Sequence, residues 1–231
     1  MIVTVHQPAY IPWLGYFEKI MRSDVYVFLD SVQYESRSFI NRNKIKTPSG
    51  AIWLSIPVKS KGHRDSSMLD TQINNELMWK EDHLKSIYLN YKRAPRFEEC
   101  YTKLEQLYKN DYELLADLCY DHLLFWLNEL GVQKKIIRSR ELNIHSKKSD
   151  LILDINKSLQ ASQYISGALG KGYLEEEKFK AENIEIIYQD YKHPVYPQLW
   201  GEFIPYMSII DFWMNTDDVS IIDGGTQNGL V

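Results

Sequence analysis

The first histidine of the chain occupies a position from which it could act on a ligand. Residues 2–5 have the apolar, β-branched character of a buried strand, and His6-Gln7-Pro8 ends it. Pro8 restricts the backbone before it, so the His6 side chain is expected to project from the strand end with little freedom. Imidazole commonly serves as a general base near neutral pH. The alternative is a structural histidine whose ring hydrogen-bonds the backbone of the turn.

A block of positive charge favours the binding of an anion. Residues 37–64 contain seven lysines and arginines and no acidic residue, within a chain of net charge −4. Arginine can grip a phosphate with two parallel hydrogen bonds, and lysine acts on it as a point charge. We therefore predict that Arg37, Arg42 and Lys44 bind phosphate and that Asn41 orients a ligand carbonyl or hydroxyl. The block should also lower the pKa of a nearby His6. A solvated basic loop is the alternative.

The composition limits the class of protein. With 231 residues, of which 44% are hydrophobic, the chain can bury a substantial core. The negative net charge argues against general nucleic-acid binding. No apolar run reaches the roughly 18 residues of a membrane span, and the start of the chain lacks the features of a signal peptide. We expect a cytoplasmic protein without membrane insertion, whose two cysteines remain reduced thiols.

The order of the expected elements indicates the fold. A strand at 2–5, a helix from about Pro12 and a strand at 24–29 form one βαβ unit. The alternation predicts a single α/β domain over 1–231, with a parallel sheet and a helical block inserted at about 76–131. The remaining expected strands are 51–58, 135–138, 163–166 and 184–188, and the remaining helices are 150–159, 175–182 and 203–215.

Polar clusters follow several of these strands. Ligands of open parallel sheets bind beyond the carboxyl ends of the strands. We expect a binding site there, with Asp30 and Gln33 orienting the base or the ligand. The clusters are His6-Gln7, residues 30–33, Ser166-Gly167 and residues 188–198.

Two further histidines are weaker candidates. His83 follows Trp79 by one helical turn, which is also typical of a histidine at the edge of a core. His193 lies in a loop with two prolines that could present Tyr196 and Gln198 to a ligand. No metal-ligand spacing connects the histidines, and we expect neither a metal nor a cofactor.

The longest motif carries a family resemblance. The segment His6-Gln7-Pro8-Ala9-Tyr10-Ile11-Pro12-Trp13-Leu14-Gly15-Tyr16-Phe17 resembles the opening of the WbqC-like protein family. The similarity continues through Asp30, Gln33, the basic block, Trp79, His83 and Ser166-Gly167, and through His193, Tyr196, Gln198, Ser208 and Asp211. Family members occur in bacterial O-antigen and other surface-polysaccharide gene clusters, and glycine transfer has been proposed for some. The resemblance implies a cytoplasmic enzyme that tailors a nucleotide-linked or phosphorylated amino sugar.

A fainter similarity concerns the nucleotidylyltransferases. Those enzymes carry a His-x-Gly-His motif in the loop after the first strand, where it holds ATP phosphates at a helix N-terminus. Trp13 and Tyr16 stand at the two histidine positions here. The resemblance implies an adenylyltransferase-like, HUP-type core, but ordinary nucleotidyl transfer would need a substitute for the lost imidazoles.

Three hypotheses follow from these residues. The first is a transferase that joins an amino acid or acyl group to a nucleotide-linked or phosphorylated amino sugar. The second is a nucleotidylyltransferase with a degenerate motif, and the third is a non-catalytic nucleotide-sugar-binding protein. The predicted catalytic residues are His6, Asp30 and His193. The predicted substrate-binding residues are Gln7, Tyr10, Trp13, Tyr16, Gln33, Arg37, Asn41, Arg42, Lys44, His83, Ser166, Tyr196 and Gln198.

Overall fold

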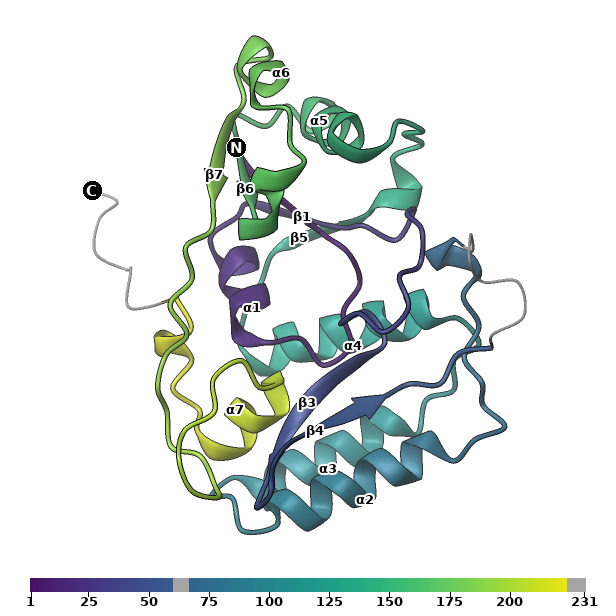
Figure 1. Cartoon of the computed structure of the whole chain (residues 1–231), viewed down its shortest axis with the longest axis vertical. Helices are drawn as coiled ribbons and strands as arrows, with labels where there is room; N and C mark the ends of the chain where they lie inside the picture. Colours follow the sequence, from purple (N-terminus) through teal and green to yellow (C-terminus); the bar gives the residue numbers. More distant parts are fainter. Residues whose placement is uncertain (60–66, 224–231) are drawn as a thin grey trace.

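A five-stranded parallel sheet forms the centre of the upper part of the molecule in Figure 1. The computed structural model describes residues 1–59 and 67–223. The strand order is β5-β2-β1-β6-β7, which confirms the expected α/β class with a parallel sheet. The strands are β1 (Ile2–His6), β2 (Val25–Phe28), β5 (Lys135–Arg138), β6 (Gln163–Ser166) and β7 (Glu185–Tyr188).

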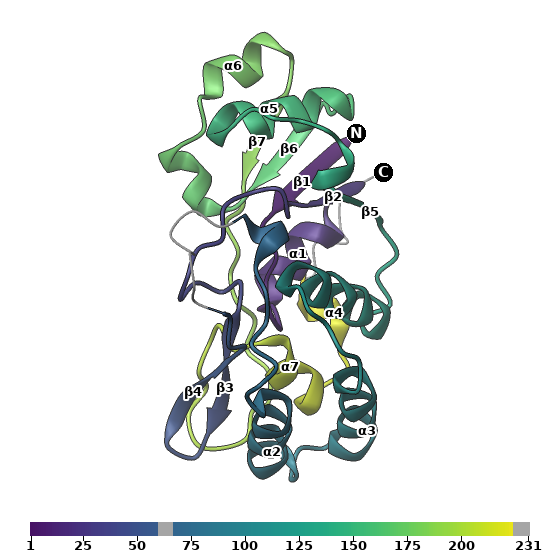
Figure 2. The same ribbon diagram turned by 90° about the vertical axis from the view of Figure 1, so that its right-hand side faces the viewer.

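Helices cover both faces of this sheet (Figure 2). Successive side chains of a strand point to opposite faces. Val25 and Val27 therefore pack with α5 (Lys148–Ser158) and α6 (Glu176–Ala181). Tyr26 and Phe28 pack on the other face, toward α1 (Leu14–Met21) and α4 (Leu115–Glu129). His6 has the same parity as Thr4, which pairs with Tyr26, so its side chain lies on the α1 face.

A second group of elements packs beneath the sheet in Figure 1. It contains α2 (Trp79–Tyr91), α3 (Phe97–Tyr108), α7 (Ile209–Asn215) and a hairpin of β3 (Arg42–Thr47) and β4 (Gly50–Ser55). Short 3-10 turns connect the larger elements at η2 (Met68–Asp70), η3 (Ser139–Glu141), η4 (Ala168–Gly172) and η5 (Val219–Ile221).

Two of the expected elements were wrong in part. The strand expected at 51–58 does not join the parallel sheet, because β4 pairs with β3 in a separate antiparallel hairpin. The helix expected at 203–215 begins only at Ile209. Tyr206 has a φ of 60°, in the left-handed region that an α-helix cannot include, so the backbone before Ser208 is irregular. The strands expected at 135–138 and 163–166 coincide with β5 and β6.

The sheet divides at its central strand. β1 pairs with β2 on one side and with β6 on the other. The strands β2 and β5 therefore extend the sheet on one side of β1, and β6 and β7 extend it on the other side. Pairing of β1 with β6 ends at Thr4 and Ile165, whereas pairing with β2 continues to His6 and Phe28. In open α/β sheets ligands bind in the crevice at such a switch point, outside the carboxyl ends of the strands.

A buried ion pair joins the ends of β2 and β5. The Asp30 side chain is fully buried and accepts hydrogen bonds from Arg138 Nε at 2.7 Å, Ser139 Oγ at 3.1 Å and the Arg140 amide at 3.2 Å. Arg138 also lies over the Tyr120 ring, 4.7 Å from its centroid, and pairs with Asp117 at 2.7 Å. These contacts fasten β5, an edge strand, to the rest of the sheet.

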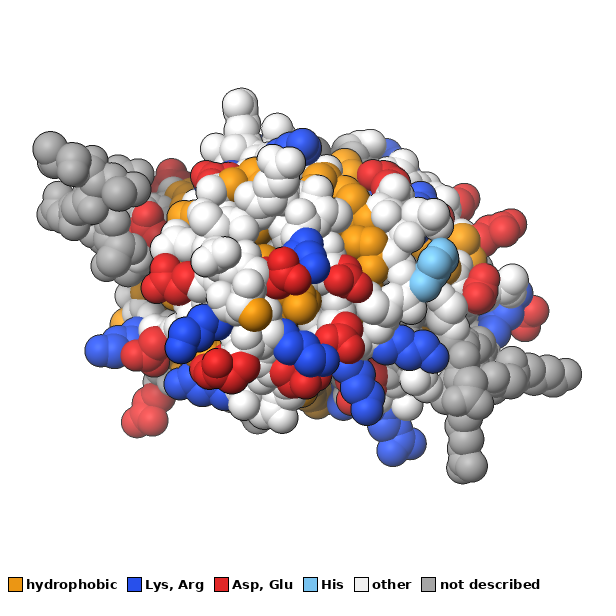
Figure 3. Space-filling view, turned by 90° about the horizontal axis from the view of Figure 1, so that it is seen from above, with side chains coloured by type: hydrophobic (Ala, Val, Ile, Leu, Met, Phe, Trp, Pro, Cys, Tyr) orange, Lys and Arg blue, Asp and Glu red, His pale blue; other side chains and the backbone are white. Residues whose placement is uncertain are grey.

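Acidic and basic side chains are interspersed on the end that carries α5 and α6 (Figure 3). Within residues 1–59 and 67–223, no helix is both long and apolar enough to cross a membrane.

The ion pair gives a prediction about stability. Asp30→Ala should lower the free energy of unfolding by about 3–5 kcal/mol, because it leaves the Arg138 guanidinium buried without its main partner. Urea denaturation followed by circular dichroism measures the change. Glu182→Ala removes the exposed ion pair with Lys157 and should leave stability within error. Equal effects of the two substitutions would contradict a structural role for Asp30.

Candidate functional site

His6 is the last residue of β1, beyond the point where β1 and β6 stop pairing. Its Nδ1 lies 2.9 Å from the carbonyl oxygen of Gln7, and its ring meets the Tyr16 ring edge-to-face at 4.7 Å. A carbonyl oxygen can only accept a hydrogen bond, so Nδ1 carries the proton and Nε2 keeps its lone pair. The hydroxyls of Tyr16 and Tyr26 bond each other and approach the carbonyls of Gln7 and His6. The turn is therefore held rigidly around a neutral imidazole.

Burial is the main cause of that neutrality. Removal from water, helped by the positive charge of Lys19, lowers the pKa of His6 to about 3, and the hydrogen bond to Gln7 opposes the shift. The sequence predicted that positive charge would lower the pKa of His6, and the pKa is indeed lowered. The cation that contributes is Lys19 on α1, and not a residue of the basic block at 37–64. At neutral pH the ring therefore carries no charge, and the same burial makes it a weak proton acceptor.

Lys19 is a residue that the sequence prediction missed. Its side chain is buried, and Nζ donates to the carbonyl oxygen of Val5 at 3.3 Å. The carbonyls of Ile2 and His6 accept hydrogen bonds on the β2 side, so by alternation the Val5 carbonyl points toward β6. Burial lowers the pKa of Lys19 to about 7, against the influence of Glu18. A lysine between the apolar Phe17 and Ile20 was the available signal.

Ser166 and Gly167 lie at the end of β6, the strand beside β1. Ser166 is buried, and its hydroxyl donates to the Gly167 carbonyl at 3.1 Å. The Gln189 amide donates to the Ser166 carbonyl at 2.8 Å, which continues the β6–β7 pairing beyond the strand. The Gln189 side chain then donates to the Gly15 carbonyl at 2.7 Å, so the end of β7 is tied to α1.

The basic residues form a separate surface on the hairpin. Lys44 pairs with Trp53 across the two strands, so both side chains lie on one face, together with Arg42. Arg42 lies over the Trp53 ring at 4.3 Å from its centroid, and Lys44 at 4.9 Å. Arg42 also donates to the Arg37 carbonyl, while its buried Nε has no partner. Trp53 remains 41% exposed, so the hairpin presents two cations and a flat aromatic ring to solvent. We call Arg42, Lys44 and Trp53 the basic face; Lys61 and Arg64 lie outside the described residues.

Tyr196 and Gln198 are engaged with a buried carboxylate. Asp211 Oδ2 accepts from Tyr196 at 2.8 Å and from Gln198 at 2.7 Å, and Oδ1 accepts from Tyr91 at 2.7 Å. Lys46 Nζ donates to the Gln198 side-chain oxygen at 3.0 Å. Burial raises the pKa of Asp211, and the three donors act against that rise. The network fastens the segment after β7 to the hairpin and α2.

Tyr10 and His83 meet in the interior of the lower part. The Tyr10 hydroxyl lies 2.8 Å from His83 Nδ1 and also bonds the Tyr108 hydroxyl. Both side chains are buried, and burial lowers the pKa of His83 to about 4. The edge-to-face contact of His83 with Trp79, at 5.4 Å, completes an aromatic core contact. The structure therefore gives these two residues packing roles and does not bring them to His6.

The remaining predicted residues lie in loops. Asn41 donates to the Ile56 carbonyl at 2.9 Å and joins β3 to the end of β4, while its Oδ1 has no partner. Gln33 is bridged to Ser67 in the segment that leaves β2. Trp13 and His193 lie in one cluster of rings with Tyr191 and Tyr206.

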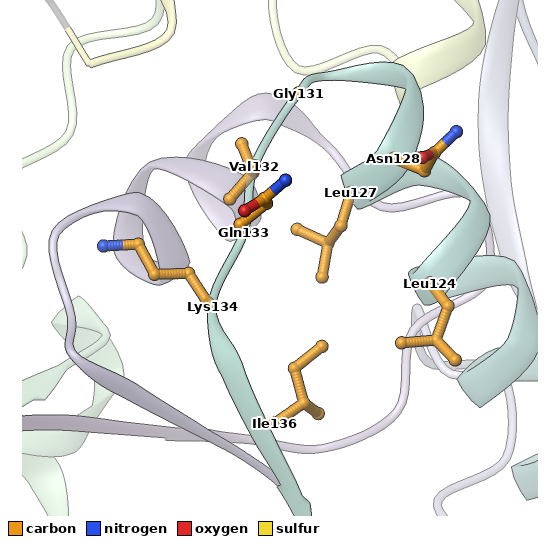
Figure 4. A pocket seen from close by; sticks show the side chains of 8 residues that line it. All are labelled: Leu124, Leu127, Asn128, Gly131, Val132, Gln133, Lys134 and Ile136. Atoms are coloured by element: carbon orange, nitrogen blue, oxygen red, sulfur yellow. The ribbon is translucent and has the colours of Figure 1, made fainter.

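Two surface hollows lie away from His6 and the basic face. Figure 4 shows one, between the end of α4 and β5, lined by Leu124, Leu127, Asn128, Gly131, Val132, Gln133, Lys134 and Ile136. A second lies between α2 and α3 and includes Tyr108. Neither contains His6 or the basic face. In the described part of the chain, no three His, Cys, Asp or Glu side chains are grouped to hold a metal.

The environment of His6 gives a prediction that needs no substrate. The His6 ring should remain neutral from pH 8 down to about pH 4, one unit above its pKa. A ¹H–¹³C NMR titration follows the ring, and the spectrum of His6→Asn assigns it. Free imidazole in the same tube reports an ordinary titration near pH 6.5. A His6 signal that moves together with the free imidazole would show that the ring is hydrated.

Comparison with known proteins agrees with the motif at the end of β1. The chain matches the model of the WbqC-like protein family over residues 7–222. It is also similar to the uncharacterized protein Rv1507c of Mycobacterium tuberculosis, with 31% identity over 215 residues that cover 92% of this chain and 93% of that protein. No solved structure matches the chain. The family match runs from the turn after His6 to η5, and the chain therefore belongs to the WbqC-like protein family.

Proposed function

We propose that this protein is a transferase that acts on a nucleotide-linked or phosphorylated small molecule, with His6 as the general base. The observation that supports this most is the state of the His6 ring. A neutral imidazole, fixed through Nδ1 and keeping the lone pair of Nε2, stands where the central strands separate. To act as a base on an attacking hydroxyl or amine, this ring must gain a higher pKa when the substrate binds, through a negative charge of the substrate beside it.

The basic face suits the other half of such a substrate. A nucleotide sugar presents a pyrophosphate and a planar base. Arg42 and Lys44 can neutralise the phosphates, and the part of Trp53 that these two cations and Phe39 leave exposed can contact the base. The unpartnered Nε of Arg42 adds a donor that a phosphate oxygen would satisfy. The segment between β2 and β3 connects the basic face to the end of β2 in the sheet (Figure 2).

The identity of the transferred group rests on the family resemblance. Surface-polysaccharide gene clusters suggest an amino sugar as acceptor, modified by an amino acid such as glycine or by an acyl group. An amine that attacks as a nucleophile gives up a proton to a base. We assign the role of that base to His6. Cytoplasmic tailoring of O-antigen or lipopolysaccharide precursors is the corresponding biological role.

The sequence predicted Asp30 and His193 as catalytic residues, but neither of them is assigned a catalytic role in this proposal. Asp30 holds Arg138 and does not contact the His6 ring, so it acts on the site through the sheet. His193 belongs to the ring cluster with Trp13. His6 is therefore the single base of the proposed reaction.

Substitution of His6 tests the catalytic role. His6→Asn should reduce turnover by about 10²–10⁴, because an amide cannot shuttle a proton but can still donate to the Gln7 carbonyl. Mass spectrometry of products, with nucleoside-diphosphate amino sugars and candidate amino-acid or acyl donors, measures the loss. The exposed His145 provides the matched control His145→Asn. Full turnover by His6→Asn would favour the non-catalytic binding protein.

Substitution of Arg42 tests the basic face. Arg42→Ala should weaken binding of a nucleoside diphosphate by about 1.5–3 kcal/mol, the range for hydrogen bonds to charged groups. Added salt should weaken wild-type binding more than binding by the variant. Calorimetry provides both measurements. Lys92, which lies over the Tyr88 ring on α2, gives the control Lys92→Ala. An unchanged affinity in a folded Arg42→Ala protein would remove the basic face from the site.

A coupled assay tests nucleotidyl transfer. Trp13 and Tyr16 stand in place of the phosphate-binding histidines, and their rings contact Tyr191 and His6. We therefore expect no release of pyrophosphate from ATP or CTP in the presence of sugar phosphates. Sustained release that depends on the protein would make nucleotidyl transfer the leading function.

A further inference from the structure

Four aromatic rings form a closed cycle beside the first turn of α1. Trp13 meets Tyr191 at 5.4 Å between centroids, Tyr191 meets His193 at 6.1 Å, His193 meets Tyr206 at 5.1 Å and Tyr206 meets Trp13 at 5.6 Å. Each ring is inclined to its neighbour by 65–78°, so neighbouring rings stand nearly perpendicular to one another. We call these four residues the aromatic box.

Two buried polar atoms of the box have no hydrogen-bond partner. His193 Nδ1 lies 2.9 Å from the Pro194 carbonyl oxygen, which can only accept, so the proton is on Nδ1. The remaining nitrogen, Nε2, therefore offers a lone pair, and it is buried without a donor. Burial lowers the pKa of His193, which keeps this lone pair available. The Tyr191 hydroxyl is likewise buried and unpartnered. Groups left in this state ordinarily receive a partner from water or a ligand.

The glycine at position 15 allows two of these rings to approach each other. A Cβ atom on Gly15 would lie 2.2 Å from the Trp13 ring and 2.8 Å from the Tyr191 ring, so only glycine allows Trp13 and Tyr191 to close together. An isolated bridge between Trp13 and Ser208 holds the first side of the box against the start of α7. The box is therefore built from three separate segments that the fold brings together.

The chemistry of the box suits a cation that donates hydrogen bonds. Ring faces attract positive charge within about 6 Å of their centroids, and a point at the centre of a cycle with these sides satisfies that distance for all four. Glu18, which is paired with Arg22 at 2.9 Å, and Asp223 add to the rise that burial causes in the pKa of Tyr191. In the described chain, lysines and arginines lie over rings such as Trp53 and Tyr88, but over none of these four.

We propose that the aromatic box binds the primary ammonium group of a substrate, with Nε2 of His193 accepting one of its N–H bonds. The substrate assignment rests on the proposed transfer, in which an amino acid and an amino sugar both carry such a group. Trp13 and Tyr16 are three residues apart at the start of α1, and Tyr16 contacts His6. The first turn of α1 therefore joins the ammonium site to the proposed base.

Calorimetry with simple amines tests the assignment and distinguishes the two sources. Glycine and D-glucosamine are titrated separately, and N-acetylglycine and N-acetylglucosamine provide forms without the ammonium charge. We expect saturable binding of one of the amines and loss of binding on acetylation. Tyr206→Leu should weaken this binding by roughly two- to thirty-fold, the range for one cation–π contact, and Tyr206→Phe should retain it. Tyr206 is 53% exposed, so neither substitution threatens the fold.

A control and a second readout complete the test. Tyr88 is similarly exposed and makes edge-to-face contacts with Phe97 and Tyr101, so Tyr88→Leu should leave amine binding unchanged. The ¹⁵N NMR signal of His193 Nε2 should move when the amine binds, because the lone pair gains a donor. Equal binding of acetylated and free amines, or the absence of amine binding, would overturn the ammonium site.

Inorganic pyrophosphate separates this inference from the proposed function. If pyrophosphate binds in an Arg42-dependent manner and neither amine binds, the box inference fails alone. If an amine binds in a Tyr206-dependent manner and pyrophosphate does not bind, the ammonium site stands and the phosphorylated substrate is wrong.

Discussion

The central strand β1 is bonded in parallel on both sides, but not over its whole length. It follows β2 as far as His6 and leaves β6 after Thr4. The Thr4 hydroxyl donates to the Ile165 carbonyl at 2.8 Å at the last pair, so the separation begins at a defined residue. Beyond that pair the Val5 carbonyl has Lys19 as its donor and His6 turns toward α1. The position of every group assigned to the site depends on this divergence.

Three charged side chains described above are buried, and their partners differ. Lys19, Asp30 and Asp211 are each buried, and burial of a charge is unfavourable unless partners compensate it. Asp30 has a guanidinium and two further donors, and Asp211 has two tyrosines and a glutamine. Lys19 has a carbonyl at 3.3 Å and a depressed pKa, so it is the least compensated of the three. Perturbed groups of this kind cluster at functional sites, and this one adjoins His6.

The abundance of aromatic residues has two separate explanations. Tyr10, His83, Tyr108 and their neighbours form an interior core in which hydroxyl and imidazole groups satisfy one another. The box around Trp13 differs, because Nε2 of His193 and the Tyr191 hydroxyl are buried without a protein partner. The same residue types therefore serve stability in the lower part of the molecule and are available for binding beside α1. The two groups of rings differ in whether their buried polar atoms have hydrogen-bond partners, and not in their residue types.

The sequence by itself determined the five strands of the parallel sheet and the location of the His6 turn. Short apolar runs that end at polar residues or glycine predicted β1, β5 and β6, and Pro8 marked the turn after β1. The alternation of strands and helices determined the parallel sheet in the same way, since its periodicity is local.

Only the tertiary structure decided which polar side chains remain available. Tyr196, Gln198 and Asp30 have the residue types of a binding site, but partners distant in sequence, Asp211 and Arg138, occupy them. Tyr191 and Tyr206 carried no signal, because their meeting with Trp13 depends on a loop that returns from β7 to the start of α1. The pKa of His6 likewise depends on Lys19 and on exclusion of water, which local sequence does not specify. Residue type and spacing are properties of a segment, whereas burial and pairing arise only when distant segments meet.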